Sequence, residues 1–191
     1  MISVVYSSRL YRELLDRTVE PGDVVIEIGP HVGSATKRYC ARAALTIAID
    51  KGSESADPFR KIREKYPGVR FYHEDVRSFE TVAKVMKETQ RCDVLAVDMG
   101  GGRFADTVFK VWGVWSGVFR PQHSIIRSRS IAEFIQKARV VDPSVIREFP
   151  DDGWLSTWGR SVPTRLKDQL GEFSYWVDPS RIGPSAGKKK S

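Results

Sequence analysis

The chain has 191 residues and a formal net charge of +7 at pH 7, a length that suits one domain with a hydrophobic core. No apolar run approaches the roughly 20 residues that a membrane-spanning helix needs, so we expect no membrane contact. Cys40 and Cys92, the two cysteines of the chain, have neither metal-ligand nor disulfide-framework spacing, so we expect no metal site. The N-terminal residues lack the apolar core of a signal peptide, which predicts a soluble cytoplasmic protein.

Much of the positive charge lies at the C-terminal end. Residues 181–191 contain Arg181, Lys188, Lys189 and Lys190 but no acidic residue, and their small polar composition predicts a disordered basic tail. We therefore expect one domain over residues 1–180, of which residues 143–180 form a variant C-terminal part. Because that domain is only mildly basic, the net charge alone does not establish a nucleic-acid partner.

Strand-like and helix-like segments alternate along the chain, which predicts an α/β fold with a parallel sheet covered by helices on both faces. The expected strands cover Val24–Ile28, Leu45–Ile49, Val69–Tyr72, Asp93–Val97 and Ser124–Arg127. The expected helices run approximately over Ser8–Arg17, Ser34–Arg42, Asp57–Lys65, Ser78–Thr89, Asp106–Phe119 and Ile131–Val141. Beyond Val141 the pattern weakens, and the remaining candidate strands are Val145–Phe149 and Phe173–Val177.

A glycine turn joins the first expected strand to its helix. Gly29 and Gly33 are separated by Pro-His-Val, and the next strand ends on Asp50. Such a turn lets a ligand lie against backbone N–H groups at a helix start, and an acid ~20 residues later can bind ribose hydroxyls. The pattern therefore predicts a nucleoside-bearing cofactor. NAD is disfavoured because the middle glycine of the dinucleotide fingerprint is missing and Pro30 has no N–H.

The same segment carries a family resemblance. Glu27-x-Gly29-x-x-x-Gly33-x-x-Thr36 resembles motif I of the class I S-adenosylmethionine (SAM)-dependent methyltransferases, and EIGPHVGSAT is similar to the EIGPGxGxLT form of the rRNA adenine dimethyltransferases. The resemblance covers about residues 5–142. It implies a Rossmann-like sheet of strand order 3-2-1-4-5 with degenerate or variant C-terminal strands. It also implies that the loop holds the methionine end of SAM and that Asp50 holds its ribose.

Further acids follow the other strands, and the carboxyl ends of parallel strands meet at one rim of a sheet. The resemblance implies that Asp75 accepts a hydrogen bond from the adenine amino group, that Val76 offers a backbone contact, and that Asp98 lies near the transferred methyl group. The alternative for each acid is helix capping or exposure to solvent. The predicted cofactor-binding residues are Glu27, Gly29, Pro30, His31, Gly33, Asp50, Lys51, Asp75, Val76 and Asp98, and Asp98 is also the candidate catalytic residue.

The segment after the fourth strand bears on the substrate. Asp98-Met99-Gly100-Gly101-Gly102 departs from the Asn/Asp-Pro-Pro-Tyr motif of methyltransferases that act on adenine amino groups. DVLAVDMGGG is more similar to the DVVLSDM segment of the FtsJ-like RNA 2′-O-methyltransferases. That family also needs a lysine in its last catalytic strand, where this chain has arginine, which cannot act as a base.

Four arginines are expected at the same rim, namely Arg77, Arg103, Arg127 and Arg129. Arg127 and Arg129 share a face if their strand continues, and guanidinium groups suit phosphate recognition. Pairing with nearby acids is the alternative role for these side chains. The rim arginines, the basic tail and the two motifs favour RNA as the substrate.

Other functions remain open at this point. Protein or small-molecule methylation uses the same fold, and so does aminopropyl transfer, although a polyamine substrate calls for more acids than this rim has. A non-catalytic RNA-binding subunit would keep the basic residues without cofactor affinity. The oligomeric state is left open.

Overall fold

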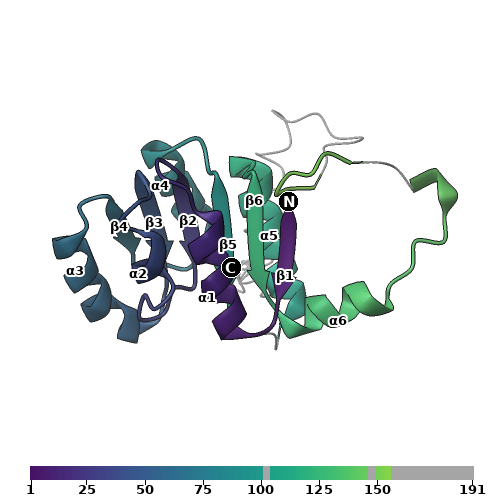
Figure 1. Ribbon diagram of the computed structural model, residues 1–191, viewed down its shortest axis with the longest axis horizontal. Helices are drawn as coiled ribbons and strands as arrows, with labels where there is room; N and C mark the ends of the chain where they lie inside the picture. Colours follow the sequence, from purple (N-terminus) through teal and green to yellow (C-terminus); the bar gives the residue numbers. More distant parts are fainter. Residues whose placement is uncertain (101–103, 146–148, 156–191) are drawn as a thin grey trace, which may run out of the picture.

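The computed structural model describes residues 1–100, 104–145 and 149–155 of the chain. Within these residues six strands form one parallel sheet of order β1-β6-β5-β2-β3-β4 (Figure 1). The strands are β1 (Ile2–Val5), β2 (Val24–Ile28), β3 (Leu45–Ile49), β4 (Val69–Tyr72), β5 (Val94–Asp98) and β6 (His123–Arg127). Strands β2 to β6 are the five expected ones and take the predicted order 3-2-1-4-5, which confirms the fold class.

Helices cover both faces of this sheet. They are α1 (Ser8–Thr18), α2 (Thr36–Tyr39), α3 (Ala56–Lys65), α4 (Phe79–Glu88), α5 (Ala105–Phe119) and α6 (Arg129–Lys137), with short 3-10 turns η1 (Ser53–Ser55) and η2 (Pro143–Val145). None of the helices in the described part of the chain is long and apolar enough to span a membrane.

Three expectations about these elements were wrong. The helix expected over Ser34–Arg42 is a single turn, α2, because Gly33 and the residues up to Ala35 form hydrogen-bonded turns that begin with Gly33 N–H on the Pro30 carbonyl. Helix α6 ends at Lys137 rather than near Val141. In the candidate strand Val145–Phe149, the two residues that the structure describes are not in a strand: Val145 is the last residue of η2, and Phe149 has no regular secondary structure. Phe173–Val177 lies outside the described residues.

The sheet separates two hydrophobic clusters. Alternate residues of each strand point to opposite faces, so Ile26 and Ile28 join one cluster and Val25 joins the other. Helices α4 and α5 complete the first cluster, in which Trp112 and Trp115 are buried. Helices α1, α2 and α3 complete the second. Burial on both faces explains why the central strands are predominantly apolar.

Strand β1 was not expected from the sequence. It pairs in parallel with β6, from Ile2 beside Ser124 to Val5 beside Arg127. Because all six strands are parallel, β1 ends at the same rim as β2, β5 and β6, and α1 begins there. Figure 1 shows α1 and α6 starting at the same end of the molecule, where the chain leaves β1 and β6. The N-terminal segment therefore lies beside the rim at which the sequence predicts the cofactor site.

Candidate functional site

A cleft of about 840 Å³ opens at this rim, over the carboxyl ends of β2, β3 and β5. Its position matches the general rule for open α/β sheets, in which ligands bind where the strand order reverses. Nine of the ten predicted cofactor-binding residues line it: Glu27, Gly29, Pro30, His31, Asp50, Lys51, Asp75, Val76 and Asp98. Arg127 also lines the cleft. No cluster of His, Cys, Asp and Glu that could hold a metal ion occurs among the described residues.

Gly29 brings the glycine turn against the end of β5. Its φ is +73°, and a Cβ atom built on it would lie 1.8 Å from the Asp98 carbonyl oxygen. A side chain at this position would therefore collide with backbone, which cannot move aside without displacing β5. The turn and the β5 end form one compact floor for the cleft only because residue 29 is glycine.

Asp50 ties two loops of the cleft together. One carboxylate oxygen accepts the His31 N–H at 2.8 Å, and the other accepts the Gly52 N–H at 2.8 Å. His31 has a φ of +53°, a conformation that few residues other than glycine adopt, and the Asp50 bond holds it. A carboxylate has about four acceptor positions, so each oxygen can still accept a hydroxyl from a ligand.

Glu27 has one satisfied and one unsatisfied oxygen. It is 1% exposed; its Oε2 accepts the hydroxyls of Thr36 at 2.5 Å and Tyr39 at 2.6 Å, whereas its Oε1 has no partner among the described residues. Burial raises the pKa of the Glu27 carboxyl to about 7; the two hydroxyl bonds oppose that rise and the charges of Asp98 and Asp50 add to it. The free oxygen of a cleft-lining carboxylate is suited to a ligand donor or cation.

Asp75 is already engaged by two cations. The Arg77 Nε and Nη2 atoms donate to its two oxygens at 2.9 and 2.6 Å, and Lys51 Nζ lies 3.3 Å away. Burial alone would raise the pKa of Asp75, but the bonds and charge of Arg77 and the charge of Lys51 lower it to about 2. The adjoining Val76 is held through its carbonyl, which accepts the Trp115 Nε1–H at 2.9 Å. The backbone at this side of the cleft is therefore fixed.

Asp98 and Arg127 form an ion pair across the ends of β5 and β6. Arg127 Nη1 lies 2.9 and 3.0 Å from the two Asp98 oxygens, and Arg127 Nε donates to the Tyr6 carbonyl at 3.1 Å. Arg127 thus connects β6 to both β5 and the segment after β1. Pairing with an acid, the alternative given for the rim arginines, applies to this residue.

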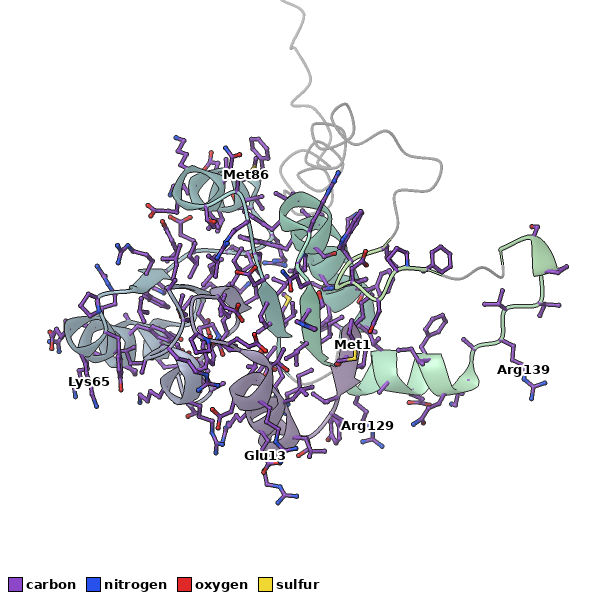
Figure 2. The ribbon with its side chains drawn as sticks, turned by 45° about the horizontal axis from the view of Figure 1, so that its top comes forward. Met1, Glu13, Lys65, Met86, Arg129 and Arg139 are labelled. Carbon is purple, nitrogen blue, oxygen red and sulfur yellow. The ribbon has the colours of Figure 1, made fainter. Side chains whose placement is uncertain are left out.

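Two predicted residues are placed outside the cleft. Gly33, with φ +73°, is required for packing, because a Cβ there would lie 2.4 Å from the Ile62 side chain of α3. Arg129 would share a strand face with Arg127 only if the strand continued, and it does not: β6 ends at Arg127, and Ser128 caps α6 by accepting the Ile131 N–H. Figure 2 shows Arg129 projecting from the start of α6. Arg103 lies outside the described residues.

The sequence did not identify the contribution of α1. Ser8, Tyr11 and Arg12 line the cleft. Tyr11 is 3% exposed and its hydroxyl has no partner among the described residues. Burial raises the Tyr11 pKa, and the charges of Glu27 and Asp98 raise it further while Arg127 lowers it. The segment Ile2-Ser3-Val4-Val5, with three β-branched residues, could have signalled β1 and, through it, the position of α1.

Comparisons with known proteins agree with this architecture. No protein-family model matches the chain. The ribosomal RNA small subunit methyltransferase A of Dehalococcoides mccartyi (strain CBDB1) is 33% identical over 58 residues, which cover 30% of this chain and 20% of the relative. The aligned segment therefore spans only a fifth of that protein.

Two solved structures extend the comparison to the fold. SMU.1697c, described as a methyltransferase from Streptococcus mutans and solved with SAH, superposes with a TM-score of 0.52 and 13% identity over 71% of this chain and 82% of its own. An rRNA methylase from Streptococcus thermophilus gives a TM-score of 0.50 and 8% identity over 68% of this chain and 78% of its own. The chain has the Rossmann-like fold of these proteins, as its sequence predicted.

Proposed function

We propose that this chain, which has the fold of the class I methyltransferases, binds S-adenosylmethionine in the cleft and transfers its methyl group to an RNA acceptor. The observation that carries the proposal is the meeting of three features in one cleft: the Gly29 turn against β5, the Asp50 carboxylate, and the unpartnered Glu27 oxygen. The solved neighbours described as methyltransferases, one of them holding SAH, support the same cofactor.

The residues of the cleft fit the chemical groups of this cofactor. Asp50 keeps free acceptor positions for two ribose hydroxyls, and Glu27 Oε1 can accept from the ammonium group. Because Asp75 is occupied by Arg77, we infer that it uses its remaining acceptor capacity for the adenine amino group while Val76 fixes the backbone beside the ring. The bound cofactor supplies an activated methyl group on a sulfonium, whose positive charge suits a cleft with six acidic side chains.

The acceptor would enter on the side of Asp98 and Arg127. Their ion pair holds the Asp98 carboxylate at the end of β5, where an acceptor N–H or O–H can donate to it. Alignment of two reactants can supply roughly 7–11 kcal/mol of a barrier, so a site that mainly positions the acceptor beside the cofactor can do without a strong base. An RNA acceptor is supported by the rRNA methyltransferase relative.

Calorimetric titration with SAM and, separately, with NAD tests the proposal. We expect SAM to bind and NAD not to bind. Asp50→Ala should weaken SAM binding by about 10-fold or more, because hydrogen bonds to a charged group contribute roughly 1.5–3 kcal/mol each. Asp57→Ala is the matched control, since Asp57 is an exposed acid of α3 outside the cleft.

The outcomes separate the alternatives. Binding of NAD instead of SAM would overturn the proposal in favour of an oxidoreductase, and absence of both would favour a non-catalytic RNA-binding subunit. If SAM binds, transfer of a tritiated methyl group to extracts treated with ribonuclease or protease decides between an RNA and a protein acceptor.

A further inference from the structure

We propose that the acceptor RNA is bound in single-stranded form across a surface made by the N-terminal segment and the start of α6. We call this surface the N-terminal platform and define it by Tyr6, Arg9, Arg12 and Arg129. The inference rests on the proposed function, which it deepens by naming the form of the substrate and the residues that hold it.

The platform borders the cleft because β1 pairs with β6. The Ser128 N–H donates to the Val5 carbonyl at 2.9 Å, which holds the β6–α6 turn against the β1–α1 turn. Arg12, one turn into α1, lines the cleft itself. Arg127 Nε is bonded to the Tyr6 carbonyl. An RNA strand that lies over Tyr6 can therefore place its next nucleotide beside Asp98 and Arg127.

Tyr6 and Arg129 present flat surfaces of the kind that bind unstacked bases. Tyr6 is 53% exposed. The Arg129 guanidinium lies 5.4 Å from the centre of the Tyr6 ring. Exposed tyrosine rings and arginine planes stack on the bases of single strands, whereas bases in a duplex are already stacked on one another. An exposed aromatic ring held by a guanidinium at the edge of a catalytic cleft is therefore suited to a splayed nucleotide.

The surroundings of Tyr6 are suited to phosphate groups. Helices α1 and α6 both begin at the platform, and neither has an acidic residue in its first turn. Their N-terminal partial positive charges add to Arg9, whose side chain is 80% exposed, and to Arg12. The acids nearby are already paired: Glu13 lies 3.9 Å from Arg9, Asp98 is bonded to Arg127, and Glu133 is bonded to Lys137.

Fluorescence anisotropy with a labelled single-stranded RNA of ~12 nucleotides, and with the same RNA as a duplex, tests the platform. We expect the full chain to bind the single strand more tightly than the duplex. Tyr6→Leu, which removes the aromatic ring, should raise the Kd for the single strand about five-fold or more, whereas Tyr6→Phe should retain binding. Arg129→Ala should raise the Kd and reduce the salt dependence of binding by about one phosphate contact.

Lys65→Ala is the matched control for Arg129→Ala. Lys65 lies over the ring of Tyr66 at 5.2 Å, a contact of the same kind, and Figure 2 shows it on the other side of the sheet from Arg129. This control should bind RNA as the unaltered chain does. Thermal unfolding of each variant checks that the fold is retained.

Three results would overturn the platform: no binding of the single strand, equal or tighter binding of the duplex, or an unchanged Kd in Tyr6→Leu. SAM titration of the same proteins keeps this inference separate from the proposed function. SAM binding without RNA binding removes the platform alone, whereas RNA binding that depends on Tyr6 in a chain without SAM affinity removes the proposed methyl transfer alone.

Discussion

Glu27 combines a structural role with the ligand-binding role that we propose for it. Its Oε2 is bonded to Thr36 and Tyr39 from α2, and this bonding holds the short helix against β2. Its Oε1 is buried without a partner among the described residues. Burial of an unpaired charge is costly, so the carboxyl takes up a proton more readily in the folded chain than in the unfolded one.

This difference predicts a dependence of stability on pH. The folded pKa of Glu27 is raised from 4.5 to about 7, so its stabilising proton is fully present below the unfolded pKa and is lost as the pH rises through the folded pKa. The free energy of unfolding should therefore fall between about pH 4.5 and pH 7 by roughly 3 kcal/mol from this group. Urea unfolding at several pH values measures it.

Glu27→Gln provides the comparison. Glutamine does not titrate, so the difference in unfolding free energy between the two proteins should change across this pH range. A constant difference from pH 4.5 to pH 8 would contradict the raised pKa.

The individual site residues were predicted unevenly. Motif I and the strand-end acids follow from local pattern, and the structure brings nine of the ten cofactor candidates into one cleft. Gly33 was assigned to the ligand but packs against Ile62, because a motif does not reveal which glycine faces the neighbouring helix. Arg129 does not share a strand face with Arg127 because Ser128 caps α6, so β6 ends at Arg127, where the sequence also placed its end.

At the level of elements, the glycine turn depends on its contact with β5. The requirement for glycine at residue 29 has two parts, a positive φ of +73° and the closeness of the Asp98 carbonyl oxygen. The first part costs an L-residue roughly 1–2 kcal/mol. The second adds a steric clash with backbone, which a turn packed against a central strand cannot relieve.

Gly29→Ala should therefore destabilise the chain by about 3 kcal/mol or more and abolish SAM binding. Gly22→Ala separates the two parts, since Gly22 has a φ of +93° with nothing within 4 Å of a built Cβ. It should cost only about 1–2 kcal/mol and leave SAM binding intact. Equal destabilisation by the two substitutions, measured by denaturant unfolding, would show that the close approach to Asp98 is unimportant.

The central strands were predicted well because each is an apolar run bounded by turn residues. Strands β2, β3 and β4 have the expected bounds, β5 is shifted by one residue at both ends, and β6 begins one residue earlier than expected. Strand β1 was missed because it is four residues long, lies at the edge of the sheet and is only partly buried. Its existence depends on pairing with β6, which is 121 residues away in the sequence, from Ile2 to His123.

For the whole molecule, the parallel topology brings motifs that are separate in the sequence together in one site. Six parallel strands place every strand end at one rim, so residues from β2 to Arg127 of β6 line one cleft. The cofactor candidates lie at the ends of β2, β3, β4 and β5, and the ends of β6 and β1 beside Asp98 remain for the proposed acceptor. The sequence predicted the cofactor side of this division, whereas the acceptor side could be assigned only once the position of β1 was known.

A crystal structure with S-adenosylhomocysteine tests the central claim most directly. The account predicts that the ribose hydroxyls donate to the Asp50 carboxylate and that the ammonium group donates to Glu27 Oε1, with the sulfur facing Asp98. Failure of the ligand to bind, or binding away from Asp50 and the Gly29 turn, would contradict the assignment of this cleft as a methyltransferase site.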